Sequence, residues 1–312
     1  MIVQPSYDRK WLGRFSWQYR LLVGYFSVQK AFTSSGARAD YRKERSELEK
    51  LGAMFKPLAS IETTEDNADG VPVEWIASPA SSPARTVFFI HGGSYVSGSI
   101  SSYRSLGANI GHASGARTLM VDYRLAPEHP YPAAIEDAAK AYMWLIEKHI
   151  SADKVVVAGD SSGGGLALAL AVYLRDRSLP LPAAVVSLSP MTDMLMSGDT
   201  WTTNSKSDVV IYPHKEREFA RMYLGGADPL MPYASPIYAD MKGLPPVCIQ
   251  VGTNEVLLSD STRLAEKARK AGVDVTLEEW EGMQHDWHFT ASLVPEGREA
   301  IVRLGDFIRE RT

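Results

Sequence analysis

From about residue 70 onward, the chain alternates short apolar runs, bounded by turn residues, with longer segments of helical periodicity. This alternation limits the fold more than any other feature, because it is typical of a largely parallel sheet with helices on both faces. The predicted strands are Val73–Ile76, Thr86–Ile90, Thr118–Tyr123, Lys154–Ala158, Ala184–Leu188, Val247–Val251 and Val275–Glu279. The predicted helices are Ser102–Ala113, Ala133–His149, Ser162–Arg177, Asp260–Ala271 and Glu296–Arg309. We therefore predict the α/β fold class.

One long segment interrupts this alternation. Almost sixty residues separate the strand that ends at Leu188 from the strand that begins at Val247. They include Met194–Met196 and a helical stretch, Glu216–Leu224. An insertion at the carboxyl end of a strand is well placed to form a lid over a site.

Residues 1–38 have their own character, with six basic residues against Asp8 alone. Apolar positions recur there at helical spacing: Trp11, Leu12, Phe15, Tyr19, Leu22 and Phe26. A basic, aromatic helix suits a membrane surface, and it equally suits a helix that packs over the domain behind it. We favour packing, and membrane contact by residues 1–38 stays open. Residues 39–52 predict a charged helix that ends at Gly52.

The composition is that of an ordinary globular protein, with 312 residues, 45% hydrophobic and 22% charged. This length allows one large domain, or one domain with an appendage. The net charge of −4 gives no reason to expect a nucleic-acid partner. The single cysteine, Cys248, cannot form an internal disulfide, and no stretch has the length of a membrane span. We therefore expect a cytoplasmic location.

The strongest chemical signal is the motif Gly159-x-Ser161-x-Gly163, which lies between a predicted strand and a predicted helix. A serine at the apex of a sharp strand-to-helix turn projects its hydroxyl above the sheet, and the glycines relieve the crowding around it. The helix that follows directs its N-terminal amides towards the serine. Since the lysine of a phosphate-binding loop is absent, we favour a nucleophile over a phosphate site.

A second glycine-rich turn begins at His91, directly after the strand Thr86–Ile90. Ester hydrolysis places negative charge on the carbonyl oxygen, and each backbone N–H aimed at that oxygen contributes about 2.7–4 kcal/mol. We predict an oxyanion hole that consists of Gly92, Gly93, Ser94 and Ser162, with the last three as amide donors. We expect His91 to orient this loop and not to act as a base.

At these two turns, and at Val121–Ala134 between them, the chain closely resembles the bacterial hormone-sensitive-lipase-like esterases. The resemblance covers roughly residues 60–312. It implies an α/β-hydrolase core, a helical cap, no cofactor and activity on short-chain acyl esters. The chain differs from the family in having Ser94 at the third glycine of the oxyanion motif and Ser162 where alanine usually follows the nucleophile.

The other members of a catalytic triad follow the serine in this fold, first an acid and then a histidine. The family places its histidine at His285, usually followed by glycine where this chain has Asp286. His288 is the alternative base. Glu255 lies thirty residues before His285, which is the family's spacing for the acid, and we prefer it to Asp260. We expect Asp260 to cap the next helix.

We predict a serine carboxylesterase that hydrolyses short-to-medium-chain acyl esters, without metal or cofactor. Residues 1–60 and 192–225 form the predicted cap, and residues 61–191 and 226–312 the catalytic domain. The predicted pocket residues are Tyr95, Asp160, Trp201, Tyr212 and Trp287, although the large side chains, like Met194–Met196, equally suit the core of the cap. Amide or lactone hydrolysis and a non-catalytic binding protein stay open as alternatives. The resemblance also leads us to expect a homodimer.

Overall fold

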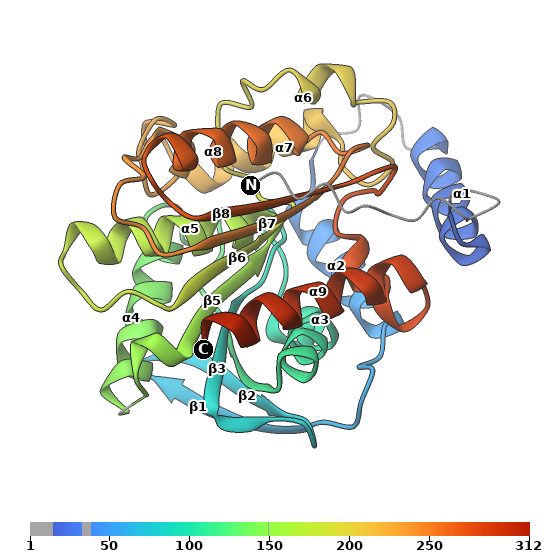
Figure 1. Cartoon of the computed structure of the whole chain (residues 1–312). Coiled ribbons are helices and arrows are strands. Elements are labelled where there is room, and N and C mark those ends of the chain that lie inside the picture. Colours follow the sequence, from blue (N-terminus) through green and yellow to red (C-terminus); the bar gives the residue numbers. More distant parts are fainter. Residues whose placement is uncertain (1–14, 33–38, 149) are drawn as a thin grey trace.

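The computed structural model describes residues 15–32, 39–148 and 150–312, and its centre is an eight-stranded sheet in the order β1-β2-β4-β3-β5-β6-β7-β8 (Figure 1). The strands β1 and β2 pair antiparallel, as do β2 and β4, and all the other neighbours are parallel. The predicted α/β fold class is therefore confirmed. The strands are β1 (Glu62–Ala68), β2 (Val71–Ala77), β3 (Ser82–Ile90), β4 (Ala116–Val121), β5 (Val155–Asp160), β6 (Ala184–Leu188), β7 (Val247–Gly252) and β8 (Val275–Trp280).

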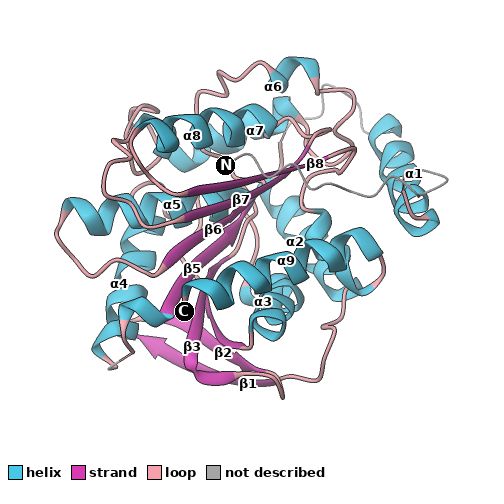
Figure 2. Ribbon diagram, in the orientation of Figure 1, coloured by secondary structure: helices cyan, strands magenta, loops and turns pink. Residues whose placement is uncertain are grey.

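Helices cover both faces of this sheet (Figure 2). The helices α3 (Ile100–Ser114) and α9 (Pro295–Arg311) pack on one face. The other face is covered by α4 (Ala133–Glu147), α5 (Ser161–Asp176) and α8 (Leu258–Lys270). Neighbouring residues of a strand point to opposite faces, so Phe88 packs in one core and Phe89 in the other.

The edge strand β1 was not predicted from the sequence. Its first six residues are polar and exposed, and only Ala68 at its end is buried, so it lacks the alternation that marks a half-buried strand. Charged residues at a sheet edge discourage pairing with other chains. A turn signal was nevertheless present, since Asp69-Gly70 joins β1 to β2 with positive φ at both residues (54° and 98°).

The prediction that Gly52 ends the second helix is wrong. The helix α2 (Tyr41–Met54) continues past it, and Gly52 lies where α2 approaches α3. A β-carbon at this position would lie 2.3 Å from the carbonyl oxygen of Ser102. The glycine therefore permits close helix packing and is not a termination signal.

The remaining elements gather above the carboxyl ends of the strands (Figure 1). They are α1 (Trp17–Phe32), α6 (Thr200–Thr203), α7 (Pro213–Leu224) and two short 3₁₀ turns, η2 (Pro236–Tyr238) and η3 (Trp287–Ser292). A further 3₁₀ turn, η1 (Ala152–Lys154), directly precedes β5 and lies at the amino end of that strand. The hydroxyl of Tyr19 in α1 donates to Gly282 O (2.9 Å), and Lys30 Nζ donates to Ser205 O (2.8 Å). One side of α1 thus packs on the molecule, as the favoured alternative requires.

The other side of α1 is exposed, and its apolar residues are Trp17, Leu21, Tyr25 and Val28. The predicted helical positions Trp11 and Leu12 lie outside the described residues. In the described part of the chain, no helix combines the length and the apolar character that a membrane span needs.

Candidate active site

The serine of the G-x-S-x-G motif lies at the tip of a sharp turn between β5 and α5. Its backbone has a φ of 52°, in the left-handed region, which is strained for most residues other than glycine and asparagine. A β-carbon at Gly159 would lie 2.3 Å from Gly163 O, and one at Gly163 would lie 2.2 Å from Ile90 O. Both glycines are therefore required for the turn to pack against β3, and this packing lifts Ser161 above the sheet.

Ser161, His285 and Glu255 form a continuous chain of hydrogen bonds. The Nε2 atom of His285 lies 3.0 Å from Ser161 Oγ, and its Nδ1 atom lies 3.0 Å from Glu255 Oε2. These three residues come from β5–α5, the loop before η3 and the loop after β7, so they meet only in the folded chain. A nucleophile, a base and a residue that orients the base are thus within hydrogen-bond reach.

The carboxyl group of Glu255 is fully buried and held on both oxygens. Its Oε1 atom accepts from Ser189 Oγ (2.8 Å) and from the amide of Gly252 (2.6 Å). Burial raises the pKa of Glu255 to about 7, against the opposing effect of its hydrogen bond to His285. Ser189 was not predicted, because a serine that supports a carboxylate from another strand leaves no local pattern in the sequence.

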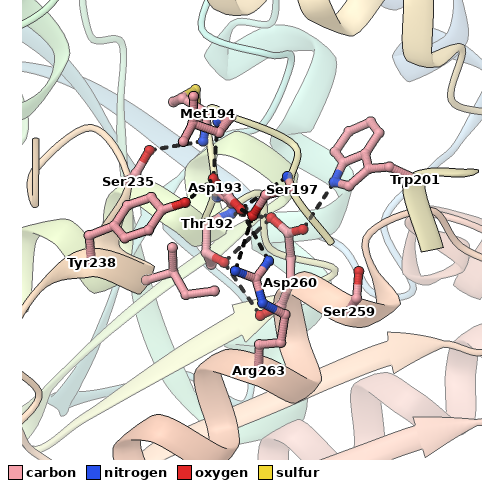
Figure 3. A network of polar contacts seen from close by, with 12 residues as sticks. Thr192, Asp193, Met194, Ser197, Trp201, Ser235, Tyr238, Ser259, Asp260 and Arg263 are labelled. Carbon is pink, nitrogen blue, oxygen red and sulfur yellow. Dashed lines mark hydrogen bonds and ion pairs between the residues drawn. The ribbon is translucent and has the colours of Figure 1, made fainter. Parts of the chain in front are cut away.

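The alternative acid, Asp260, lies away from this chain of hydrogen bonds. It is in the first turn of α8 and not at its N-cap, which is Leu257, so the predicted capping role is corrected. Its carboxylate accepts from the amides of Thr192 (2.9 Å) and Asp193 (3.1 Å). Asp260 therefore anchors the start of the insertion on α8 (Figure 3).

The alternative base, His288, also lies apart. It is buried, and its Nε2 atom lies 2.9 Å from Gln250 Oε1. Burial lowers the pKa of His288 to about 3, so the ring is neutral in the folded protein.

The loop after β3 presents free backbone amides next to the serine. The amides of Gly93, Ser94 and Ser162 make no hydrogen bond to another described residue. Gly93 has a φ of 107°, and a β-carbon there would lie 2.3 Å from Ser97 O, so only glycine fits. The prediction for Gly92 needs correction, because its N–H donates to Asp160 Oδ1 (3.1 Å) and is not available to a substrate.

His91, at the start of this loop, is buried and stacks on Tyr123 with a centroid distance of 4.4 Å. Its Nδ1 atom lies 2.8 Å from Gly92 O, and burial lowers its pKa to about 4. A neutral, enclosed imidazole supports the loop and cannot reach a reacting group.

A cavity of about 160 Å³ opens beside Ser161 and His285, and its wall is mostly apolar. The apolar and aromatic lining is Tyr19, Leu22, Val23 and Phe26 from α1, Leu48 and Leu51 from α2, Phe55 directly after α2, Tyr103 from α3, Val210 and Ile211 from the insertion, and Trp287 and Phe289 from η3. Three carboxyl groups, those of Glu44, Glu216 and Asp286, also face it. The N-terminal helices and the insertion thus both contribute to the wall.

Glu216 is a site residue that the sequence did not reveal. Its Oε2 atom accepts from Ser94 Oγ (2.7 Å), which ties α7 to the oxyanion loop. Burial raises the pKa of Glu216 to about 7, opposed by the hydrogen bond from Ser94. The residue lies in a run of charged residues, where a buried carboxyl group has no distinguishing signal.

Of the predicted pocket residues, only Trp287 is in the cavity wall. Tyr95 is buried in the core and stacks on Tyr223 with a centroid distance of 3.7 Å. Trp201 donates from Nε1 to Asp260 Oδ1 (3.0 Å), within the network of Figure 3. Tyr212 is half-buried outside the cavity, and Asp160 is enclosed beneath the oxyanion loop. Tyr95 and Trp201 therefore belong to the core, which is the alternative that the sequence left open for the large side chains.

Comparison with known proteins agrees with this geometry. A family model for the alpha/beta hydrolase fold matches residues 87–289. An acetyl-hydrolase of Streptomyces hygroscopicus is 46% identical over 239 residues, which are 77% of this chain and 80% of that protein. The structure of EstE5 soaked with p-nitrophenyl butyrate has a TM-score of 0.90 at 40% identity and covers 95% of this chain and 99% of that chain.

The structure of an esterase from the bacterial hormone-sensitive lipase family has the same TM-score, 0.90, and 40% identity, over 95% of this chain and 98% of that chain. This chain therefore belongs to the bacterial hormone-sensitive-lipase-like esterases, within the α/β hydrolases. The predicted fold, family and enzyme class, a carboxylic-ester hydrolase, are confirmed.

Proposed function

We propose that this chain is a serine carboxylesterase that cleaves short-to-medium-chain acyl esters through an acyl-enzyme on Ser161. The observation that carries the proposal is the pair of 3.0 Å distances that link Ser161 Oγ to His285 and His285 to Glu255. This geometry provides a path for the proton of the serine hydroxyl and a fixed orientation for the imidazole.

The reaction follows from these contacts. His285 Nε2 takes the proton as Ser161 Oγ attacks the ester carbonyl, and Glu255 stabilises the imidazolium that forms. The free amides of Gly93, Ser94 and Ser162 receive the negative oxygen of the tetrahedral intermediate. The imidazolium then protonates the leaving alcohol, and a water molecule releases the acyl group by the same steps.

The size of the cavity supports a compact acyl group. A wall of Leu22, Phe26, Leu48 and similar side chains favours an alkyl chain, while the helices α1 and α2 limit its length. The relatives agree with this size, since one is named an acetyl-hydrolase and another was soaked with p-nitrophenyl butyrate. The helical cap, the homodimer and the cytoplasmic location remain predictions.

A panel of substrates tests this proposal. We expect kcat/KM to be highest for p-nitrophenyl esters with short acyl chains and to fall by at least about tenfold for long chains that exceed the cavity. The matched anilide of butyric acid and a small lactone should react far more slowly. Preferred cleavage of either of these would identify an amidase or a lactonase on the same triad, and no turnover at all would identify a binding protein.

Replacing the acid tests its assignment. We expect Glu255→Gln to lower kcat by about 10²- to 10⁴-fold, because an amide neither fixes the tautomer of His285 nor stabilises its charge. The control is Asp260→Asn, which weakens the anchor of the insertion and lowers the free energy of unfolding by about 1–3 kcal/mol. Assays of kcat with p-nitrophenyl butyrate and urea unfolding separate the two effects. A large loss of kcat in the Asp260 variant alone would transfer the role of acid to that residue.

A further inference from the structure

Asp286 directly follows the proposed base in the sequence, and its carboxylate contacts the same nitrogen atom that faces the nucleophile. The Oδ2 atom of Asp286 lies 3.0 Å from His285 Nε2, and Ser161 Oγ also lies 3.0 Å from that nitrogen. With Glu255 on Nδ1, the imidazole therefore has a carboxylate at each of its two nitrogens. The mechanism proposed above uses only one of them.

The backbone and the surroundings hold Asp286 in this position. Its φ is 51°, in the left-handed region, and it directly precedes η3 as the N-cap residue. Its side chain is 12% exposed and that of His285 is 7% exposed, so little water reaches the contact. The second carboxylate oxygen, Oδ1, is buried and has no hydrogen-bond partner among the described residues. The charge of Asp286 is thus directed at His285 and is poorly screened.

The other titratable groups around His285 do not replace this contact. They are Glu255 from the loop after β7, Asp160 from β5, Glu216 from α7 and His288 from η3. Tyr103 from α3 lies beside Asp160 and Asp286. The pKa of Asp160 is raised well above its ordinary range, first by burial and then by the Asp286 carboxylate, so the charged form of Asp160 is disfavoured. Glu216 contacts Ser94 and not the imidazole.

We propose that Asp286 is a positioning residue that holds the Nε2 proton of the His285 imidazolium and thereby competes with Ser161 for that nitrogen. The inference rests on the proposed function, because it assigns His285 as the general base. In the resting enzyme, the contact with the Asp286 carboxylate favours the protonated imidazole. As the pH rises the proton leaves, and Nε2 becomes free to accept the proton of Ser161.

The direction of the pH effect follows from the charges. Burial lowers the pKa of His285, but the carboxylates of Asp286 and Glu255 outweigh burial and raise this pKa well above its ordinary value. A base works only when it is deprotonated, so kcat/KM is lost as the pH falls through this raised pKa. Removing the Asp286 charge lowers the pKa, and the ascending limb of the pH profile must then move to lower pH.

The test compares the pH dependence of kcat/KM for p-nitrophenyl butyrate, between about pH 5 and about pH 9, in four proteins. They are the wild type, Asp286→Asn, Asp286→Gly and Asp274→Asn. Asparagine and glycine both accept a positive φ, so these variants remove the charge with little backbone strain. Asp274 forms a surface ion pair with Arg311 and is the matched control for the loss of a carboxylate.

We expect the midpoint of the ascending limb to fall by about 1 pH unit or more in both Asp286 variants, as is usual when an opposite charge in contact is removed. The limb of the control should not move. A folded Asp286 variant whose kcat/KM drops by a constant factor at every pH would show a purely structural role and overturn the proposal. If one of the two Asp286 variants does not fold, the pH profile of the other variant tests the proposal. A wild-type protein without ester turnover would instead contradict the proposed function.

Discussion

Replacing Ser161 by alanine is expected to lower kcat for p-nitrophenyl butyrate by about 10⁴- to 10⁶-fold. The Ser161 hydroxyl is the only hydroxyl in hydrogen-bond contact with His285 Nε2 among the described residues, so the variant has no serine to form the acyl-enzyme. Alanine has the size of serine without the oxygen and keeps the same strained backbone (φ 52°). Urea unfolding should therefore give a free energy close to that of the wild type, which separates loss of chemistry from loss of fold.

Ser162→Ala is the matched control for this prediction. The Ser162 side chain accepts from the amide of Tyr95 at 3.3 Å and does not contact His285. Alanine also keeps the backbone amide that the oxyanion hole uses. We expect the control to retain kcat within about tenfold of the wild type. If the Ser162 variant were inactive and the Ser161 variant active, the nucleophile would be the neighbouring serine.

Replacing His285 by glutamine is expected to have an effect of similar size, a loss of about 10⁴-fold or more in kcat. Glutamine cannot take the proton of Ser161 at neutral pH, and it leaves Glu255 buried without its basic partner. Because Glu255 already has a raised pKa of about 7, it can protonate to relieve its charge, and the protein should remain folded. The loss should persist at every pH, since the base itself is absent.

His288→Gln is the control for the base. His288 is buried and bonded to Gln250, so its replacement should reduce the free energy of unfolding by about 1–3 kcal/mol and leave kcat within about tenfold. Circular dichroism and urea unfolding report the first effect, and steady-state kinetics the second. An active His285 variant beside an inactive, folded His288 variant would reverse the assignment of the base.

The parts of the fold that the sequence predicted are those with strong local signals. The strand β5 is apolar and fully buried, and the glycines around Ser161 allow only a tight turn, so residue type and structure correspond directly. The strand β1 had no such signal, because its polar, exposed residues do not follow the period of a half-buried strand. Gly52 carried a misleading signal, since a glycine that permits helix packing resembles one that ends a helix.

The active site, like the fold, has parts that the sequence predicts and parts that it does not. The order of the triad and the spacing of Glu255 from His285 were readable in the chain, as was the second glycine-rich turn. The support of Glu255 by Ser189 and the contact of Glu216 with Ser94 depend on elements distant in the sequence, so neither leaves a local pattern. Aromatic residues such as Tyr95 and Trp201 suited a pocket as well as a core, and only packing distinguishes these two environments.

Covalent labelling with a fluorophosphonate, followed by peptide mapping, tests the central claim most directly. A serine activated by His285 attacks phosphorus, and the amides that receive the oxyanion hold the adduct. We predict one label per chain, located on Ser161, together with complete loss of ester hydrolysis and no labelling of the Ser161→Ala variant. A protein that hydrolyses esters but remains unlabelled, or that carries its label on another residue, would contradict the account.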